Sequence, residues 1–343
     1  MNFLRRWNTC HSRSLFFVDG NFFCTNVKFQ NSLKTFQFQL PKQIKNQINV
    51  IIEDDLIEIE SNFKEIISNK YQQKINETIQ TSYLVSSISL LIAKLIENHN
   101  KELKNKETIW KKQILLTKTA EMVFMAHLIH QDKYNNKKSE ETKKKVQINL
   151  LFGDYLLAQS SYQLSQIGNM EVQNLVSKTI ISLVESELLF NNDITKLHEY
   201  KASLQLISTI LQNTTKASGL LFNLNQNKIN EISEFARLFA ENLQIYDDML
   251  LLNSNIFNSN STRYSPLYYI LKKDISELED LIHVKNEYND KIILEKLSKN
   301  SDLGQLNQTV KENSTKANMI LSQFESSPYL RILIELSNLL AKN

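Results

Sequence analysis

The fold class is decided by residues 42–67, which read KQIKNQINVIIEDDLIEIESNFKEII. The apolar side chains of this stretch recur at steps of three and four residues, the spacing that places them on one face of an α-helix. They are Ile44, Ile48, Ile51, Ile52, Leu56, Ile59, Phe63, Ile66 and Ile67. The pattern predicts a long amphipathic helix. Its polar face carries the acidic run Glu53, Asp54 and Asp55, which we expect to be solvated.

The same helical spacing continues along the rest of the chain, interrupted by connectors rich in Asn, Ser and Lys. We expect further helices over residues 78–98, 107–133, 146–167, 170–190, 197–223, 228–252, 265–284, 288–298, 303–323 and 328–341. No stretch predicts a β-strand. The chain is therefore expected to be all-α, with about ten or eleven helices.

Glycine and proline are scarce in this sequence. The 343 residues contain five Gly and three Pro, whereas average usage would give about forty of the two together. No proline lies between Pro41 and Pro266, which suits long uninterrupted helices. The scarcity argues against β-hairpins, propeller blades and Gly-rich phosphate loops. With 42% hydrophobic and 22% charged residues, the chain can bury a full core and is not expected to be disordered.

Charge, hydropathy and cysteine usage exclude several further classes. A formal net charge of +3 argues against a nucleic-acid-binding surface. No uncharged apolar run is long enough to span a membrane, so we expect no membrane span. The two cysteines, Cys10 and Cys24, both lie near the start of the chain. The main body therefore has neither a disulfide framework nor a Cys-based zinc site.

Residues 1–41 differ in composition from the rest of the chain. They are rich in Ser, Phe and Asn and carry many more basic than acidic side chains, namely Arg5, Arg6, Arg13, Lys28 and Lys34 against Asp19. This composition is typical of a mitochondrial presequence, and an ordinary basic tail is the alternative. We expect a targeting-like segment over residues 1–41 and one all-α domain over residues 42–343. The expected location is the mitochondrial matrix or the matrix face of the inner membrane.

The most unusual carboxylates are Asp247 and Asp248, which lie at the end of a strongly apolar predicted helix. Adjacent acids in such a place either reach toward solvent or line a cavity. A Mg²⁺-diphosphate site uses one or two carboxylates for each ion, together with phosphate oxygens. Carboxylates one helical turn apart would suit it, but the residue one turn after Asp247 is Leu251.

The order of several motifs resembles the landmarks of the trans-polyprenyl diphosphate synthase family. These motifs are EMVFMAHLIHQD at 121–132, GDYLLA at 153–158, LVESE at 183–187, and Gln244 followed by Asp247 and Asp248. The resemblance covers roughly residues 42–343. It implies an isoprenoid-synthase-type bundle around a central cavity, usually dimeric. It also implies two facing D-D-x-x-D motifs that hold Mg²⁺ ions and an allylic diphosphate.

Against that family pattern, the residues expected to do the chemistry are largely missing. The first aspartate motif reads Gln-Asp-Lys-Tyr-Asn at 131–135, so Asp132 alone matches an acid. The second, at 247–251, keeps two acids, and Gln244 is retained. The Gly-Gly-Lys-x-x-Arg-Pro segment that would bind the second diphosphate corresponds to residues 76–82, which contain no Gly, Lys, Arg or Pro. We therefore expect Asp132, Gln244, Asp247 and Asp248 to be a vestigial substrate and Mg²⁺ site, with no catalytic residue and no cofactor.

Two other patterns invite a ligand-binding interpretation. A Lys-rich stretch at 137–145 follows the first motif, and a solvated loop explains it better than a diphosphate clamp or an anionic-lipid patch. His127 and His130 are three residues apart on one predicted helix, but no third ligand supports a zinc site. We interpret His130 as inherited packing.

Three hypotheses about function follow. The leading hypothesis is a non-catalytic subunit that pairs, through a dimer-type interface, with a catalytic polyprenyl diphosphate synthase subunit and supports ubiquinone side-chain synthesis. The second is the same fold recruited as an accessory structural subunit of a large mitochondrial complex, such as a respiratory one. The third is a residual enzyme that uses Asp132, Asp247 and Asp248 with Mg²⁺. It ranks last because the cations for both diphosphates are missing.

Overall fold

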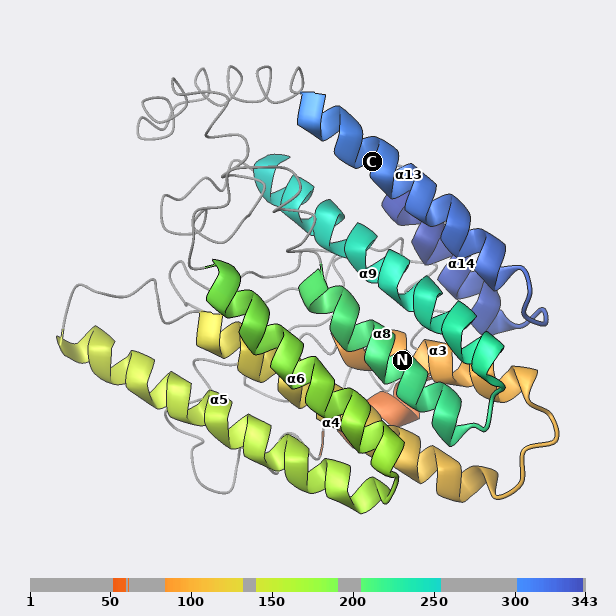
Figure 1. The fold of residues 1–343 in the computed structure, drawn as a ribbon, viewed down its shortest axis with the longest axis horizontal. Coiled ribbons are helices and arrows are strands. Elements are labelled where there is room, and N and C mark those ends of the chain that lie inside the picture. The colour runs from red at the N-terminus through yellow and green to blue at the C-terminus, as the bar shows by residue number, and fades with distance from the viewer. Residues whose placement is uncertain are drawn as a thin grey trace, which may run out of the picture.

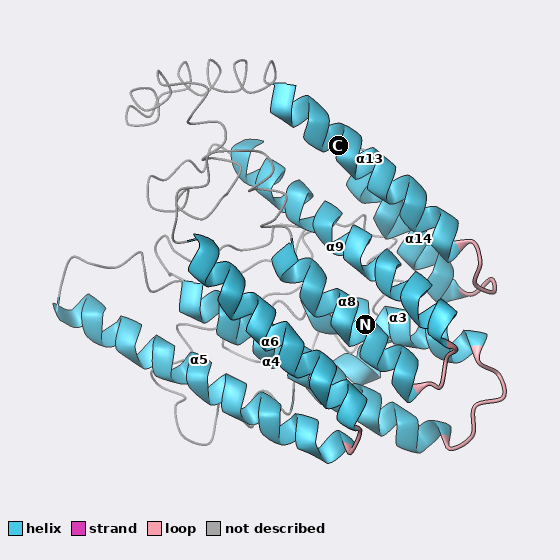
Figure 2. Cartoon of the chain, viewed as in Figure 1, coloured by secondary structure: helices cyan, strands magenta, loops and turns pink. Residues whose placement is uncertain are grey.

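The computed structural model describes residues 52–59, 61, 84–131, 140–190, 205–253 and 301–341. Every regular element within these residues is a helix, which confirms the all-α prediction (Figure 2). The helices are α3 (Leu84–His99), α4 (Lys106–Gln131), α5 (Glu140–Ile167), α6 (Met170–Phe190), α8 (Gln205–Leu221), α9 (Gln226–Asn253), α13 (Ser301–Leu321) and α14 (Pro328–Ala341). Residues 52–59 are also helical. The predicted helices over 265–284 and 288–298, and the segment 1–41, lie outside the described residues.

Most helix boundaries fall close to the predicted ones, and α6 and α14 coincide with them. Helix α5 begins at Glu140 rather than 146, because the Glu- and Lys-rich residues before 146 are good helix formers even without an apolar face. Helix α8 ends at Leu221 rather than 223, because Asn223 adopts a left-handed φ of 53°.

The helices pack around α8, which contacts α3, α4, α6 and α9. Helix α9 packs on α13, and α14 packs on both α13 and α3. Helix α5 lies along α4 at the lower edge of the bundle in Figure 1. Helices α4 and α9 both run toward the left end of that view, so their C-terminal residues lie at the same end of the bundle.

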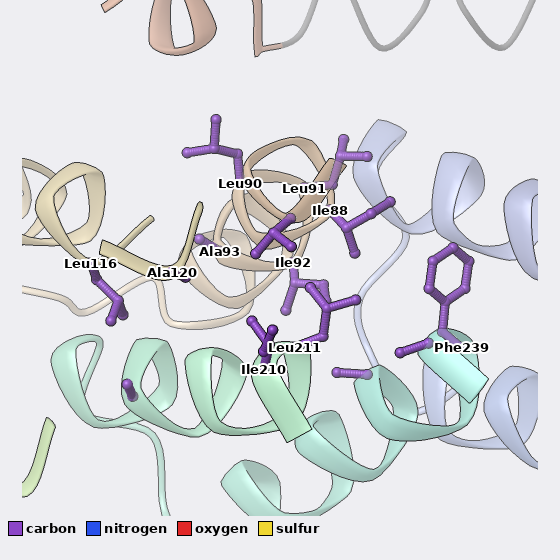
Figure 3. Close-up of a cluster of buried hydrophobic side chains, with 14 of the residues drawn as sticks. Ile88, Leu90, Leu91, Ile92, Ala93, Leu116, Ala120, Ile210, Leu211 and Phe239 are labelled. Carbon is purple, nitrogen blue, oxygen red and sulfur yellow. The ribbon is translucent and has the colours of Figure 1, made fainter. Parts of the chain in front are cut away.

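The core between these helices is made of aliphatic and aromatic side chains. Figure 3 shows Ile88 and Leu91 of α3 with Leu211 of α8 and Phe239 of α9, and each of these side chains is at least 96% buried. Burying a side chain of this size contributes about 1.5–3 kcal/mol. The apolar spacing seen in the sequence therefore becomes a shared core that joins segments distant in the chain.

Short turns with matched caps close the opposite end of the bundle. The Asn169 side chain accepts hydrogen bonds from the amides of Glu171 and Val172 at 3.0 and 3.1 Å and caps α6. Gly168, just after α5, takes a φ of 64°, a conformation that glycine adopts without strain. Ser327 caps α14 by accepting from the Leu330 amide at 3.1 Å. These caps fix where each hairpin turns.

The helical segment 52–59 docks on α3 and α4 through its acidic run. The expectation that this run is solvated holds for the exposed Asp54 and is wrong for Asp55. Trp110 Nε1 donates a hydrogen bond to Asp55 Oδ1 at 2.8 Å, and Lys94 Nζ lies 3.6 Å from Asp55 Oδ2. The same ammonium lies 3.6 Å from the centroid of the Trp110 ring. Asp55 thus joins the polar face of its own helix to polar atoms of α3 and α4. The spacing of apolar residues alone does not predict such a contact.

Candidate functional site

The candidate site lies at the end of the bundle where α4 and α9 terminate. Helix α8 packs against both of these helices and separates them. Gln244 is a buried residue of α9, and Asp247 and Asp248 continue the same helix toward Asn253. Asp132 follows the last residue of α4 and lies outside the described residues. The structure thus places three of the four predicted site residues on one helix end.

The last turn of α4 is held by a close contact with α5. His130 Nε2 lies 3.3 Å from Asp154 Oδ1 and 3.4 Å from the Leu150 carbonyl oxygen. Both partners are acceptors, so we assign the imidazole hydrogen to Nε2. The ring lies directly against Gly153, where an added Cβ would come within 2.4 Å of Nε2. The Gly-Asp pair of the 153–158 motif therefore makes room for, and orients, the histidine beside the first aspartate motif.

Closer to the beginning of α4 than His130, Glu121 is completely buried between α3 and α4. Its Oε2 accepts a hydrogen bond from the Ser86 amide at 2.7 Å. Burial raises the pKa of Glu121 to about 7, although the hydrogen bond from the Ser86 amide and the nearby Ser86 hydroxyl oppose that rise. Glu121 begins the motif at 121–132, and nothing in the order of the motifs indicates a role for it. The available signal was a carboxylate between Ala120 and Met122 in a helix that is apolar on several sides.

Buried polar contacts that start at Asn242, just before Gln244 in the chain, anchor helix α9 to α13 and α14. Asn242 Nδ2 donates to the Val310 carbonyl and to Ser314 Oγ, each at 3.0 Å. Ser314 Oγ in turn donates to the Ser337 carbonyl at 3.0 Å. These bonds fix the rotation of α9, and with it the direction in which the following turn faces.

A charged ladder runs along the partly exposed side of α9. Arg237 Nη2 and Nε donate to the two carboxylate oxygens of Glu234 at 2.6 and 2.8 Å, and Arg237 also pairs with Glu241. This fork lowers the pKa of Glu234. Burial is the larger influence on Glu241 and raises its pKa. The ladder therefore pairs Arg237 with acids of its own helix.

In the sequence, the residues at the two aspartate motifs differ from those that the family resemblance implies for Mg²⁺ binding. Mg²⁺ needs oxygen ligands in octahedral geometry, and Lys133 places a cation beside Asp132. In the second motif, the residue one helical turn after Asp247 is Leu251, whose side chain has no oxygen ligand. Among the described residues, no group of three or more His, Cys, Asp or Glu side chains could hold a metal ion. His127, the other histidine of the last two turns of α4, is 93% buried.

The curated relatives of the chain are prenyl transferases. The "Prenyl transferase" of Cyanidium caldarium is 26% identical over 226 residues, which cover 60% of this chain and 66% of that protein. The decaprenyl-diphosphate synthase of Dictyostelium discoideum is 26% identical over 242 residues, which cover 62% of this chain and 51% of that protein. The chain thus spans between half and two thirds of the length of these relatives. No family model matches it.

Solved structures share the fold over most of the chain. A decaprenyl diphosphate synthase from Rhodobacter capsulatus superposes with a TM-score of 0.67 at 16% identity, covering 87% of this chain and 98% of the other. A geranylgeranyl pyrophosphate synthase from Corynebacterium glutamicum gives a TM-score of 0.65 at 16% identity and covers 88% of this chain and 94% of the other. At these identities the likeness shows the fold. Together with the curated relatives, it confirms the resemblance to trans-polyprenyl diphosphate synthases.

No helix among the described residues is both long and apolar enough to cross a bilayer.

Proposed function

We propose that the chain is a non-catalytic subunit of a heteromeric mitochondrial polyprenyl diphosphate synthase and supports synthesis of the ubiquinone side chain. The observation that carries this proposal is the set of side chains at the two aspartate motifs. Lys133 stands next to Asp132, and Leu251 stands one turn after Asp247. Prenyl transfer depends on metal ions and cationic groups that neutralise the departing diphosphate. These residues are poorly suited to hold such ions.

By contrast, packing and hydrogen-bond contacts hold α4 and α9 in place near the two aspartate motifs. The His130 ring packs on Gly153 and faces Asp154. Asn242 ties α9 to α13 through two hydrogen bonds of 3.0 Å. A chain that keeps these contacts while lacking the ion-binding side chains suits a role in supporting another subunit.

The exposed side chains of α5 and α6 favour binding of a partner subunit with the same all-helical fold. Five of the seven large apolar side chains that are exposed among the described residues lie on these two helices. They are Leu151, Tyr162, Met170, Ile181 and Val184. Because contiguous exposed apolar patches mark interaction sites, we propose that these side chains contribute to a contact with a partner. We assign this α5–α6 surface to the catalytic subunit.

The mitochondrial location is proposed from residues 1–41. Their five basic side chains and one acidic side chain suit a presequence, which is basic and poor in acids. The relatives named for decaprenyl and solanesyl diphosphate synthesis make long prenyl chains the product class of the proposed partner.

The test is a pull-down of the tagged full-length chain from mitochondria in mild detergent, followed by mass spectrometry and a prenyltransfer assay. We expect an intact polyprenyl diphosphate synthase subunit in the eluate, with activity that requires the complex. Turnover by the purified chain alone with Mg²⁺ would overturn the non-catalytic role. Recovery in a respiratory or similar assembly, without a synthase and without activity, would instead favour the accessory-subunit hypothesis.

A pair of matched variants tests the α5–α6 surface separately. Ile181 on α6 and Met319 on α13 are exposed by 56% and 65%, so a Glu at either position should change folding stability by no more than about 0.5 kcal/mol. We expect Ile181→Glu to lose the synthase subunit in the pull-down and Met319→Glu to retain it. Equal recovery would refute the surface assignment and leave the subunit proposal standing.

A further inference from the structure

The junction between α3 and α4 contains a carboxyl group with an incomplete set of hydrogen-bond partners. Glu121 is fully buried there. Its Oε2 accepts from the Ser86 amide at 2.7 Å, whereas its Oε1 has no hydrogen-bond partner among the described residues. Ser86 is the third residue of α3 as described, so its amide belongs to the first turn, where amides lack an acceptor within the helix. The carboxyl group therefore caps the beginning of α3 from a neighbouring helix.

Two serine hydroxyls of α3 are also buried without partners. Ser86 Oγ and Ser89 Oγ have no hydrogen-bond acceptor or donor among the described residues. Ser86 Oγ nevertheless lies close enough to Glu121 to lower the pKa of that carboxyl group. Ser89 follows three residues later and shares the same helix face. Buried hydroxyls without partners are costly, so a hydrogen bond to Glu121 Oε1, which also lacks a partner, would be favourable for either of them.

No charged side chain acts strongly on this group. The first ionisable residue of α3 is Lys94, which faces Asp55. On α4, Lys118 pairs with Glu58 at 3.1 Å, and His127 lies almost two turns beyond Glu121. The ionisable residues with described side chains on the other helices packed against α3 and α4 are Lys216 on α8, Asp154, Tyr155 and Tyr162 on α5, Glu171, Lys178 and Glu185 on α6, and Tyr329, Arg331 and Glu335 on α14. None of them contributes to the pKa shift of Glu121, which burial dominates.

We propose that Glu121 and the hydroxyls of Ser86 and Ser89 form a proton-operated clasp that sets how firmly the N-terminal turns of α3 are held on α4. In the protonated clasp, the carboxyl O–H donates to a serine oxygen while Oε2 keeps the Ser86 amide. In the ionised clasp, the hydroxyls must turn to donate to Oε1, and a buried negative charge remains. Loss of the proton therefore loosens the beginning of α3.

The direction of the pH dependence follows from linkage. The pKa of Glu121 is raised from 4.5 to about 7 in the folded chain, whereas an opened α3 would expose the carboxyl group and return it to its ordinary value. The closed state binds the proton more tightly, so closure is strongest at low pH and weakens as the pH rises toward about 7. Above that pH both states are ionised, and the dependence ends.

Hydrogen exchange of the full-length chain between pH 5.5 and 8 tests the clasp. Protection factors, corrected for intrinsic exchange rates, would be compared between a peptide from the first turns of α3 and a reference peptide from α14. We expect the α3-to-α14 ratio to fall by up to about tenfold for each pH unit below about 7 and then to level off. A ratio that does not change with pH would overturn the proposal.

Three substitutions identify the group responsible. Glu121→Gln should abolish the pH dependence of the ratio, and Glu335→Gln, at an exposed position of α14, should leave it as in the wild type. Ser86→Ala keeps the amide donor but removes the hydroxyl, which lowers the pKa of Glu121, so the midpoint should move to higher pH. If Glu121→Gln does not fold, infrared spectroscopy of the wild type gives the second measurement. The protonated-carboxyl band should then disappear near pH 7, and a midpoint unaltered by Ser86→Ala would refute the clasp.

Discussion

Substituting Gly153 by alanine should displace His130 and destabilise the protein. The new Cβ would lie 2.4 Å from His130 Nε2 and 2.6 Å from Cδ2, so either the ring or the backbone of α5 must move. Strain of this kind costs about 1–3 kcal/mol. Alanine inside a helix gains about 1 kcal/mol over glycine. The net change should therefore be a loss of at most about 2 kcal/mol.

In a chain that also carries His130→Ala, the effect of Gly153→Ala on the free energy of unfolding should change sign. With His130→Ala as the background, the clash is gone, and Gly153→Ala should stabilise the chain by up to about 1 kcal/mol. Gly304→Ala is the matched control, since an added Cβ on that exposed residue of α13 meets nothing within 4 Å. It should be stabilising in both backgrounds.

Urea denaturation followed by circular dichroism at 222 nm measures all of these changes as shifts in free energy of unfolding. If Gly153→Ala stabilises the wild type as much as it stabilises the His130→Ala variant, then His130 does not depend on the glycine. That result would refute our account of the 153–154 motif.

Three further substitutions test the packing. Phe239→Ala removes a fully buried ring and should cost about 3–5 kcal/mol in urea denaturation, whereas Met319→Ala on the surface should change stability by no more than about 0.5 kcal/mol. Asn242→Ala leaves the Val310 carbonyl and Ser314 without their donor and should cost about 1–3 kcal/mol; a cost near zero would show that the tie is unimportant. Trp110→Phe keeps an aromatic face for Lys94 but loses the bond to Asp55. Limited proteolysis should then cut near residues 52–59 faster than in the wild type, and an unchanged cleavage rate would contradict the docking role of Asp55.

The helices were predictable because their boundaries depend on local chemistry. The bounds of α6 follow from its apolar spacing and from Asn169, whose side chain caps its first turn. The start of α5 was missed because helix propensity, rather than an apolar face, extends that helix to Glu140.

The contacts of the site were harder to predict, because they join residues that are distant in sequence. The ring of His130 lies on Gly153 because α4 and α5 pack side by side, and no spacing within either helix indicates that contact. Asp55 was assigned to a solvated face because its partner, Trp110, lies on α4, far along the chain. The sequence signal of Glu121 is weak, since it consists only of one acid between Ala120 and Met122 in a helix that is apolar on several sides.

The contacts of α14 also bear on the order in which the protein is made. Helix α14 follows every other described helix in the chain, yet it packs on α3 as well as on α13. Ser337 on α14 completes the chain of hydrogen bonds that begins at Asn242. A growing chain therefore leaves the ribosome with apolar surface of α3 uncovered until α14 emerges. During that interval the nascent protein should depend on chaperones, and a stop codon before α14 should yield a product that is degraded rather than a smaller stable protein.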